Sequence, residues 1–450
     1  MTFSLLLLAL SARAEVPAIP LEEALARSAQ TPSVGAASDG GDVAAAQLAA
    51  ARAARLPSVN VSGNVLIYQD EQVLNLFATS EPMDCTGIPD PFGALCAGFA
   101  EPTVVRDQVT ASLTVRAVLP LTGQVAIDRR VAAAREGLYA SEASRDAAVA
   151  DARYGAADAW FNALQAEGQL AVARAQVEGL EARVATAQAS FDAGTLTRND
   201  LLLTQLSRSQ ARQAELQLTA ARDAAYGRLG LAIGNGGEPV RPEAPPSRAP
   251  RPVPDVDALV ARALAGRPDL VSLRHRVEAA DASADAASWG RLPSLSAMGV
   301  YQHQEGQGLF GEPDLFYAGA SLDWNLWGWG SARDGVRAAR ATTSQVQHQV
   351  ESATAGVRLE VRVRAAALET ATAALQIAEG SVAQAEENRM IVDARHNAGI
   401  STMSELLDAD LALVRAQSGL VSARVEAWRA EAALERAVGS DPWGTGDAPE

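Results

Sequence analysis

The chain carries the same helix-ending motif twice, 205 positions apart. The first copy runs from Phe191 to Leu202 (F-D-A-G-T-L-T-R-N-D-L-L) and the second from His396 to Leu407 (H-N-A-G-I-S-T-M-S-E-L-L). In each copy the Ala-Gly step predicts a left-handed helix stop, and a Thr or Ser followed by an acidic residue predicts the next helix start. Two helical hairpins of one design indicate a duplicated structural unit.

Long helices are expected on both sides of each motif. Apolar residues recur every seven positions, at Leu170, Val177, Val184 and Phe191 and again at Val361, Leu368, Leu375 and Val382. The outgoing helices should cover 124–189 and 331–395, a length of about 100 Å each. Return helices should cover 200–231 and 405–438, with shorter helices at 21–30, 42–55 and 268–289. Seven-residue repeats over such lengths indicate coiled-coil packing.

A second pair of motifs marks the passage from helix to strand. Arg55 to Val59 (R-L-P-S-V) and Arg291 to Leu295 (R-L-P-S-L) each place a proline where a helix must end. Residues then alternate between apolar and polar around 58–67, 109–116, 294–302 and 316–324, which predicts four half-buried strands.

Strands of this kind suit a membrane. Their apolar face would meet lipid, their Ser, Thr and Asn face would line water, and Trp324, Trp327 and Trp329 would sit at the interface. A soluble antiparallel sheet is the alternative. Four strands cannot close a pore and an open edge cannot lie in lipid, so a membrane location would require several chains in one barrel.

These signals divide the chain into nine parts. We expect a signal peptide at 1–14, N-terminal helices at 15–56, a β-hairpin with a long extracellular loop at 57–120, a helical hairpin at 121–234, a Pro-rich equatorial linker at 235–254, the helices of a second repeat at 255–292, its β-hairpin at 293–328, its helical hairpin at 329–439, and a tail at 440–450.

Composition and the absence of known motifs exclude several classes of function. The net charge is −16 and no lysine occurs, so nucleic acid is not expected as a partner. Cys85 and Cys96 are expected to form a local disulfide after export, with two unpaired thiols as the alternative. No nucleotide-binding, metalloprotease or redox motif is present, and the four histidines have no metal-ligand spacing. We therefore expect no enzyme activity, no cofactor and no metal site.

The duplicated strand–strand–helix–glycine–helix unit resembles the TolC-type outer-membrane efflux factor family over nearly the whole mature chain. The A-G-x-x-x-x-x-[DE]-L-L tips and the R-L-P-S junctions carry the resemblance. It implies a mainly α fold with a transmembrane β part, in two repeats of a β-hairpin and a long coiled-coil helical hairpin. Three copies would form a 12-stranded β-barrel, continued by an α-helical barrel in the periplasm.

The resemblance also implies partners and a docking site. A homotrimer in outer-membrane lipid would receive its cargo from an inner-membrane transporter through a periplasmic adaptor protein. The adaptor's hairpins would dock at the helical tips, at Gly194 and Thr195 in the first repeat and at Gly399 and Ile400 in the second. A side chain on either glycine would block that approach or strain the turn.

A periplasmic gate is implied by further matches. Glu405 and Asp408 align with an acidic pair at the aperture of the family, where three copies would form two carboxylate rings that attract cations. Taken alone they are ordinary exposed acids on a helix. Asp200 and His396 match a pair that holds the closed state, and a contact between them would tighten when the histidine is protonated. Ser401 stands where some members carry an arginine, so that link is missing.

The sequence thus predicts an outer-membrane exit duct for a tripartite efflux pump or a type I secretion system. One alternative is a soluble periplasmic coiled-coil scaffold, which membrane fractionation would distinguish. Another is the outer-membrane component of a metal-ion efflux system, which the metal sensitivity of a deletion strain would decide.

Overall fold

The computed structural model describes residues 16–74, 85–92, 96, 103–243, 249, 251–253, 255–307 and 312–440. Contacts divide the chain into two compact units. The helical unit comprises residues 1–43, 139–275 and 347–450, and the sheet unit comprises residues 44–138 and 276–346. The predicted signal peptide at 1–14 lies outside the described residues.

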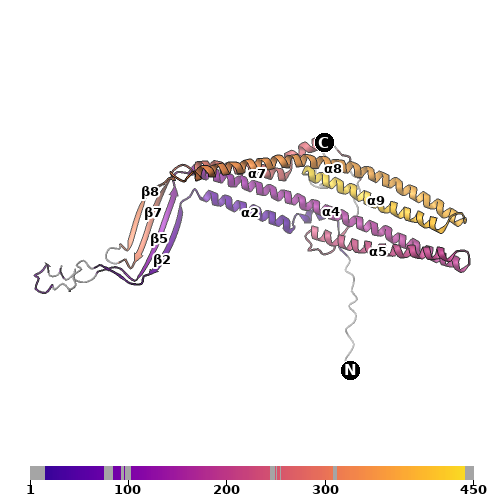
Figure 1. The fold of residues 1–450 in the computed structure, drawn as a ribbon, viewed down its shortest axis with the longest axis horizontal. Helices are drawn as coiled ribbons and strands as arrows, with labels where there is room; N and C mark the ends of the chain where they lie inside the picture. The colour runs from indigo at the N-terminus through magenta and orange to yellow at the C-terminus, as the bar shows by residue number, and fades with distance from the viewer. Residues whose placement is uncertain are drawn as a thin grey trace, which may run out of the picture. The chain divides into compact units, whose positions relative to one another are not determined.

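Helices make up most of the described chain (Figure 1). They are α1 (Leu21–Ser28), α2 (Pro32–Ala53), α4 (Gln124–Asp192), α5 (Arg198–Ala232), α6 (Val256–Gly266), α7 (Pro268–Trp289), α8 (Ser331–Asn397) and α9 (Met403–Val438). The strands are β1 (Ala18–Ile19), β2 (Ser58–Ile67), β3 (Gln72–Leu74), β4 (Thr103–Arg106), β5 (Val109–Pro120), β6 (Arg241–Pro242), β7 (Ser294–Glu305) and β8 (Asp314–Asp323). None of the described helices is both long enough and apolar enough to cross a bilayer.

The sheet unit is built on four antiparallel strands in the order β2-β5-β7-β8 (Figure 1). The central pairing of β5 with β7 joins the two repeats, with Val115 opposite Tyr301. Many apolar side chains of the sheet lie on its surface, as in Val61 (61% exposed) and Phe316 (72% exposed). The predicted alternation of apolar and polar residues is present, but β2 and β8 are exposed on both faces along almost their whole length, so these two strands are not half-buried within the described protomer.

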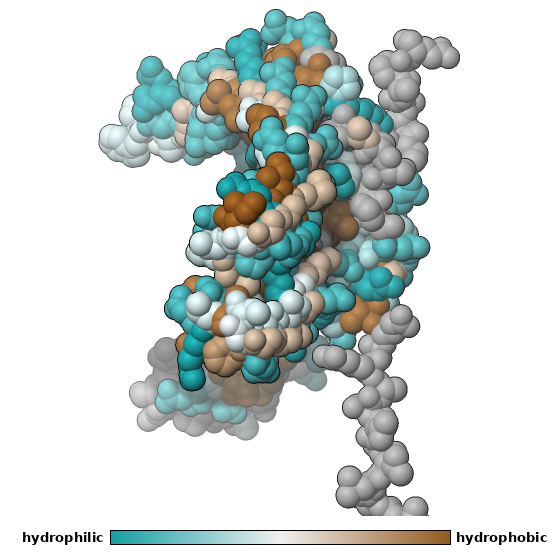
Figure 2. Space-filling view, turned by 90° about the vertical axis from the view of Figure 1, so that its right-hand side faces the viewer, coloured by the Kyte–Doolittle hydropathy of each residue, from teal (hydrophilic) through white to brown (hydrophobic). Residues whose placement is uncertain are grey.

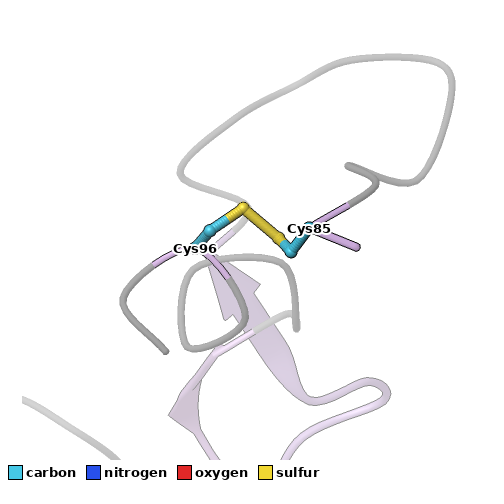
Figure 3. The surroundings of a disulfide bond; sticks show 2 residues. All are labelled: Cys85 and Cys96. Atoms are coloured by element: carbon cyan, nitrogen blue, oxygen red, sulfur yellow. A yellow bond between two sulfur atoms is a disulfide. The ribbon is translucent and has the colours of Figure 1, made fainter. Parts of the chain in front are cut away.

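The first β-hairpin continues beyond this sheet. β3 pairs with β4, and the guanidinium of Arg106 lies 3.7 Å from the ring centroid of Tyr68. Farther along, a disulfide joins Cys85 and Cys96, whose Cα atoms are 5.8 Å apart (Figure 3). This cross-link closes a short ring within the segment predicted to be an extracellular loop.

One core of the helical unit gathers around aromatic residues. Trp160 and Phe161 of α4 are almost fully buried, and Phe161 stacks on Trp428 of α9 with ring centroids 6.2 Å apart. The indole Nε1–H of Trp160 donates a hydrogen bond to the carbonyl of Ile19 (3.0 Å). Burying an indole is costly unless its N–H finds an acceptor, so this bond fixes β1 against the helices.

A second core joins α6, α7, α8 and α9. Val361 and Leu368, two of the predicted heptad positions, are 0% and 2% exposed there. Beside it, Arg267 donates to Glu360 (2.5 Å) and to the carbonyl of Ala437 (3.1 Å). Burial disfavours the charge of Arg267, but the hydrogen bond to Glu360 and the charge of Asp269 outweigh it and raise the pKa of the guanidinium.

The structure differs from the predicted ranges at two places, the start of α2 and the Pro-rich linker, while the other predicted helix limits agree to within a few residues. α2 begins at Pro32 and not at residue 42, because proline fits the first turn of a helix, where its missing N–H costs nothing. The Pro-rich linker at 235–254 contains β6, which pairs in parallel with β1. Proline excludes a helix there but still allows a short edge strand.

Candidate functional site: the tips of the two helical hairpins

The tip of the first hairpin is a Schellman turn. α4 ends at Asp192, and Gly194 takes φ +74°. The amide of Gly194 donates to the carbonyl of Phe191 and the amide of Thr195 to that of Ser190, both at 2.9 Å. These two bonds satisfy carbonyls that the helix end would leave unpaired.

The tip of the second hairpin repeats this geometry. α8 ends at Asn397, and Gly399 takes φ +75°. The amide of Gly399 donates to the carbonyl of His396 (2.9 Å) and the amide of Ile400 to that of Arg395 (2.8 Å). The duplicated sequence motif is therefore a duplicated backbone turn.

The surroundings of both glycines are open. A Cβ built on Gly194 or Gly399 would meet no other atom within 4 Å. A side chain there would strain the left-handed backbone without clashing inside this chain. The neighbouring Thr195 is exposed and Ile400 is 68% exposed, so all four predicted docking residues lie at the surface. Figure 2 looks onto this end of the helical unit, where polar residues separate the apolar patches.

Threonine caps start both return helices. Thr197 Oγ1 accepts the amide N–H of Asp200, and Thr402 Oγ1 accepts that of Glu405, both at 3.2 Å. Thr197 also donates its hydroxyl proton to the carboxylate of Asp200 (2.7 Å). The acidic residue in the first turn of each return helix also stabilises the helix, because its negative charge lies near the positive end of the helix dipole.

The predicted gate residues make no hydrogen bond or ion pair with one another among the residues that the structure describes. Glu405 and Asp408 are exposed on α9, and neither carboxylate has a hydrogen bond or ion pair in the described part of the protomer. His396 Nδ1–H donates to the carbonyl of Ser401 (3.1 Å), whereas Asp200 is bonded to Thr197. A contact between His396 and Asp200, and its tightening in acid, stay a prediction.

A charged network near the tips was missed by the sequence reasoning. Arg183 of α4 binds Asp410 of α9 through two nitrogens, at 2.7 and 3.0 Å, and lies 3.4 Å from Asp393 of α8. Arg389 of α8 binds the same Asp410 at 2.9 Å. The side chains of Arg183 and Asp410 are 19% and 17% exposed, so this pair is shielded from solvent. The network, called here the Asp410 clamp, connects the first hairpin to both helices of the second.

A comparison of the two repeats in the sequence could have indicated the Asp410 clamp. The positions 205 residues before Arg389, Asp393 and Asp410 hold Val184, Gln188 and Gln205, which carry no charge. Charges present in only one of two repeats indicate a role that the duplication alone does not explain. Apolar contacts also join the two hairpins, since Val177 and Leu180 of α4 pack with Ala211 of α5 and Leu407 of α9.

Comparison with known proteins defines the class. The sequence model of the outer membrane efflux protein family matches residues 21–235 and 259–440. The chain therefore belongs to this family of outer-membrane efflux channels. A search of curated proteins finds no match.

Solved structures share the fold. The Campylobacter jejuni CmeC outer membrane channel is 14% identical with a TM-score of 0.77, and the match covers 95% of this chain and 87% of CmeC. Vibrio cholerae outer membrane protein VceC is 17% identical with a TM-score of 0.74, covering 93% and 96%. The open state of the Neisseria gonorrhoeae MtrE outer membrane channel is 19% identical with a TM-score of 0.71, covering 94% and 89%. The chain thus has the fold of TolC-like channels.

Proposed function

We propose that three copies of this chain form a passive exit duct through the outer membrane, continued by a helical tunnel in the periplasm. The duct would serve a tripartite efflux pump or a type I secretion system, with the cargo chosen by the inner-membrane transporter. The observation that carries this proposal is the open four-stranded sheet, whose apolar side chains are exposed.

The physical argument concerns the two outer strands. β2 and β8 each pair on one side only in the described chain. Unpaired backbone groups cannot remain in hydrocarbon, so the outer strand of one copy must pair with that of the next. Twelve strands from three copies would close such a barrel. The exposed Val59 (67%) and Leu322 (66%) would then face lipid without further cost.

Cysteine cross-linking tests this arrangement. Because Cys85 and Cys96 are already paired, an introduced cysteine would be the reactive thiol of each strand. A cysteine replacing Val61 on β2 is combined in turn with cysteines from Phe316 to Leu322 on β8. A covalent trimer for one or two combinations, together with channel conductance in planar bilayers, supports the duct. A protein that fractionates as a soluble monomer with no cross-link supports the periplasmic scaffold and defeats the proposal.

The exposed acids of α9 would set the ion preference of the entrance. Around a threefold axis, Glu405 and Asp408 would supply six carboxylates to two rings, which would favour cations. The double variant Glu405→Gln, Asp408→Asn should shift the reversal potential in a salt gradient toward zero. Glu426→Gln, an exposed change farther along α9, is the control. An unchanged reversal potential in the double variant would leave these residues as ordinary surface acids.

Adaptor docking would use the exposed tip residues. Photocrosslinkers attached to cysteines replacing Thr195 and Ile400 should capture a periplasmic adaptor in intact cells. These positions avoid the left-handed backbone of the glycines, so the turn would stay intact. Capture from an exposed cysteine at Gln217 on α5, but not from the tips, would place the docking surface elsewhere.

A further inference from the structure

We propose that the end of the sheet unit where strands meet helices binds the headgroups of anionic phospholipids. This inference rests on the proposed function, because it requires the sheet to lie in the outer membrane. It adds a headgroup preference and the side chains that produce it.

The topology gathers four helix–strand junctions at one end of the sheet. β2 and β7 begin there and β5 and β8 end there, as the pairs Ser58–Val118, Ser296–Pro120 and Ser294–Asp323 establish. We call the four adjoining segments, residues 48–57, 121–137, 281–293 and 324–340, the junction collar. At 1.5 Å per helical residue, their charged groups lie within about 25 Å of the strand ends.

The junction collar is basic although the chain is acidic. Its four segments hold nine arginines and five acidic residues, whereas the whole chain has a net charge of −16. At the opposite end of the same sheet, residues 66–74, 103–108, 303–307 and 312–316 hold one arginine and six acidic residues. The sheet therefore has a positive end and a negative end, and only the positive end complements phosphate.

Several collar arginines are free to bind an anion. Arg55, Arg129 and Arg337 pair with Asp128, Asp285 and Asp334. Six further arginines are exposed and have no carboxylate partner among the described residues, and these are Arg52, Arg130, Arg135, Arg291, Arg333 and Arg340. Unpaired guanidinium groups on several segments can bind phosphate oxygens with two hydrogen bonds each.

Two tryptophans mark the apolar border of the collar. Trp327 and Trp329 are 76% and 89% exposed and contact each other edge to face at 5.8 Å. Trp329 is the one non-glycine residue of the described part with a positive φ, +50°. A bulky residue in that conformation is strained, and such strain is typical of functional positions. An exposed indole is favoured where hydrocarbon meets headgroups.

A lipid surface fits these side chains better than a glycan strand. The exposed apolar residues Leu322 (66%), Trp324 (55%) and Leu326 (71%) lead along the chain from the sheet to the tryptophan pair. A sugar would use the aromatic faces but would leave this apolar path and the arginines without a role. A phospholipid would contact the tryptophans, the apolar path and the arginines together, with its acyl chains on the path and its phosphate on the arginines.

Headgroup preference tests the proposal. The full chain is incorporated into nanodiscs of equal phosphatidylglycerol and phosphatidylcholine, and the lipids retained on extraction are identified by native mass spectrometry. The collar variant is Arg291→Gln, Arg333→Gln, Arg340→Gln. The matched control is Arg208→Gln, Arg358→Gln, Arg364→Gln, which removes the same charge from exposed and unpartnered arginines of the helical unit.

Wild type and control should prefer phosphatidylglycerol, and the collar variant should lose at least tenfold of that preference. Each arginine near an anionic lipid surface strengthens the binding affinity about fivefold. A second variant, Trp327→Ala with Trp329→Gly, should show less of the tryptophan quenching that shallow brominated lipids cause, with Trp324 as the remaining exposed indole near the sheet, and glycine accepts the left-handed backbone.

Three outcomes would overturn the inference. One is an inserted trimer with no headgroup preference, and another is equal loss in the collar and control variants. The third is retention on peptidoglycan that depends on the two tryptophans while the lipid preference is unchanged, which would assign the surface to a glycan. A chain that never inserts as a trimer would instead defeat the proposed function itself.

Discussion

The two helical tips have the same backbone and different side chains. Gly194 and Gly399 take the same φ within one degree, and Thr197 and Thr402 cap the return helices with the same bond. These features depend on short local motifs, which are specific because the left-handed turn favours glycine and the cap needs an oxygen. Duplication has therefore kept what the turn itself requires.

The side chains that reach beyond the turn differ. The clamp centred on Asp410 uses two helices of the second hairpin, and the equivalent residue of the first hairpin is Gln205. Glu405 is exposed, whereas its counterpart Asp200 is hydrogen bonded to Thr197. We infer that both tips are stabilised by their own turns and caps, and that the second hairpin is in addition held by α4 through the Asp410 clamp. The second tip is then the better candidate for movement in a gate.

Breaking the clamp should have the largest effect. Asp410→Ala leaves Arg183 partly buried without its main carboxylate partner, and the loss of stability should be about 2 kcal/mol. Because the clamp connects the hairpins, the channel should also open more readily. We expect a higher single-channel conductance in planar bilayers and a lower midpoint of thermal unfolding by circular dichroism.

The equivalent change in the first repeat is the control. Gln205→Ala removes a side chain at the same position of the duplicated unit but no charged contact, so stability should change by less than about 0.5 kcal/mol. Equal effects of the two substitutions would show that the asymmetry between the tips has no mechanical meaning. Asp410→Asn should be intermediate, because its amide can bond only one of the two arginines well.

The turn glycines should come next. Gly194→Ala and Gly399→Ala should each lower the free energy of unfolding by about 1–2 kcal/mol, because the left-handed conformation is unfavourable for alanine. Gly356→Ala, in the middle of α8 with open space around it, should instead add up to about 1 kcal/mol. Denaturant unfolding of the three variants measures this, and a neutral Gly399→Ala would mean that the turn relaxes.

The threonine caps should show a smaller and unequal effect. Thr402→Ala should cost about 1 kcal/mol, the usual value of an N-cap. Thr197→Ala should cost somewhat more, because its hydroxyl also donates to the carboxylate of Asp200. A double-mutant cycle of Thr197→Ala with Asp200→Ala measures that second bond. If the cycle gives no coupling, the bond from the Thr197 hydroxyl to the Asp200 carboxylate does not distinguish the first tip.

The sequence predicted the features that depend on local spacing. Glycine turns, threonine caps and heptads require particular residues at fixed offsets, so the limits of α4, α5, α8 and α9 could be predicted within a few residues. Val361 and Leu368 could likewise be assigned to a core from their period. The four strands of the main sheet, β2, β5, β7 and β8, followed from alternation over about eight to ten residues.

Side-chain partners across the fold could not be predicted in this way. Arg183 and Asp410 are 227 positions apart, and their contact depends on the rotation of three long helices about their axes. A shift of one residue in any of these helices would turn the side chain by about 100°. The partner of His396 could not be predicted either. The resemblance pairs it with Asp200, whereas in the protomer its imidazole donates to the carbonyl of Ser401.

The smallest expected effect concerns a polar atom that one tip has and the other lacks. Ser401 Oγ is buried without a hydrogen-bond partner in the described protomer, and its counterpart in the first tip is Leu196. Ser401→Ala should remove the desolvation cost of that hydroxyl and raise stability by about 0.5–1 kcal/mol. Ser404→Ala, an exposed change three residues on, should be neutral. A loss of stability in Ser401→Ala would mean that the hydroxyl finds its partner in the assembled trimer, and that the second tip is held from outside its own chain.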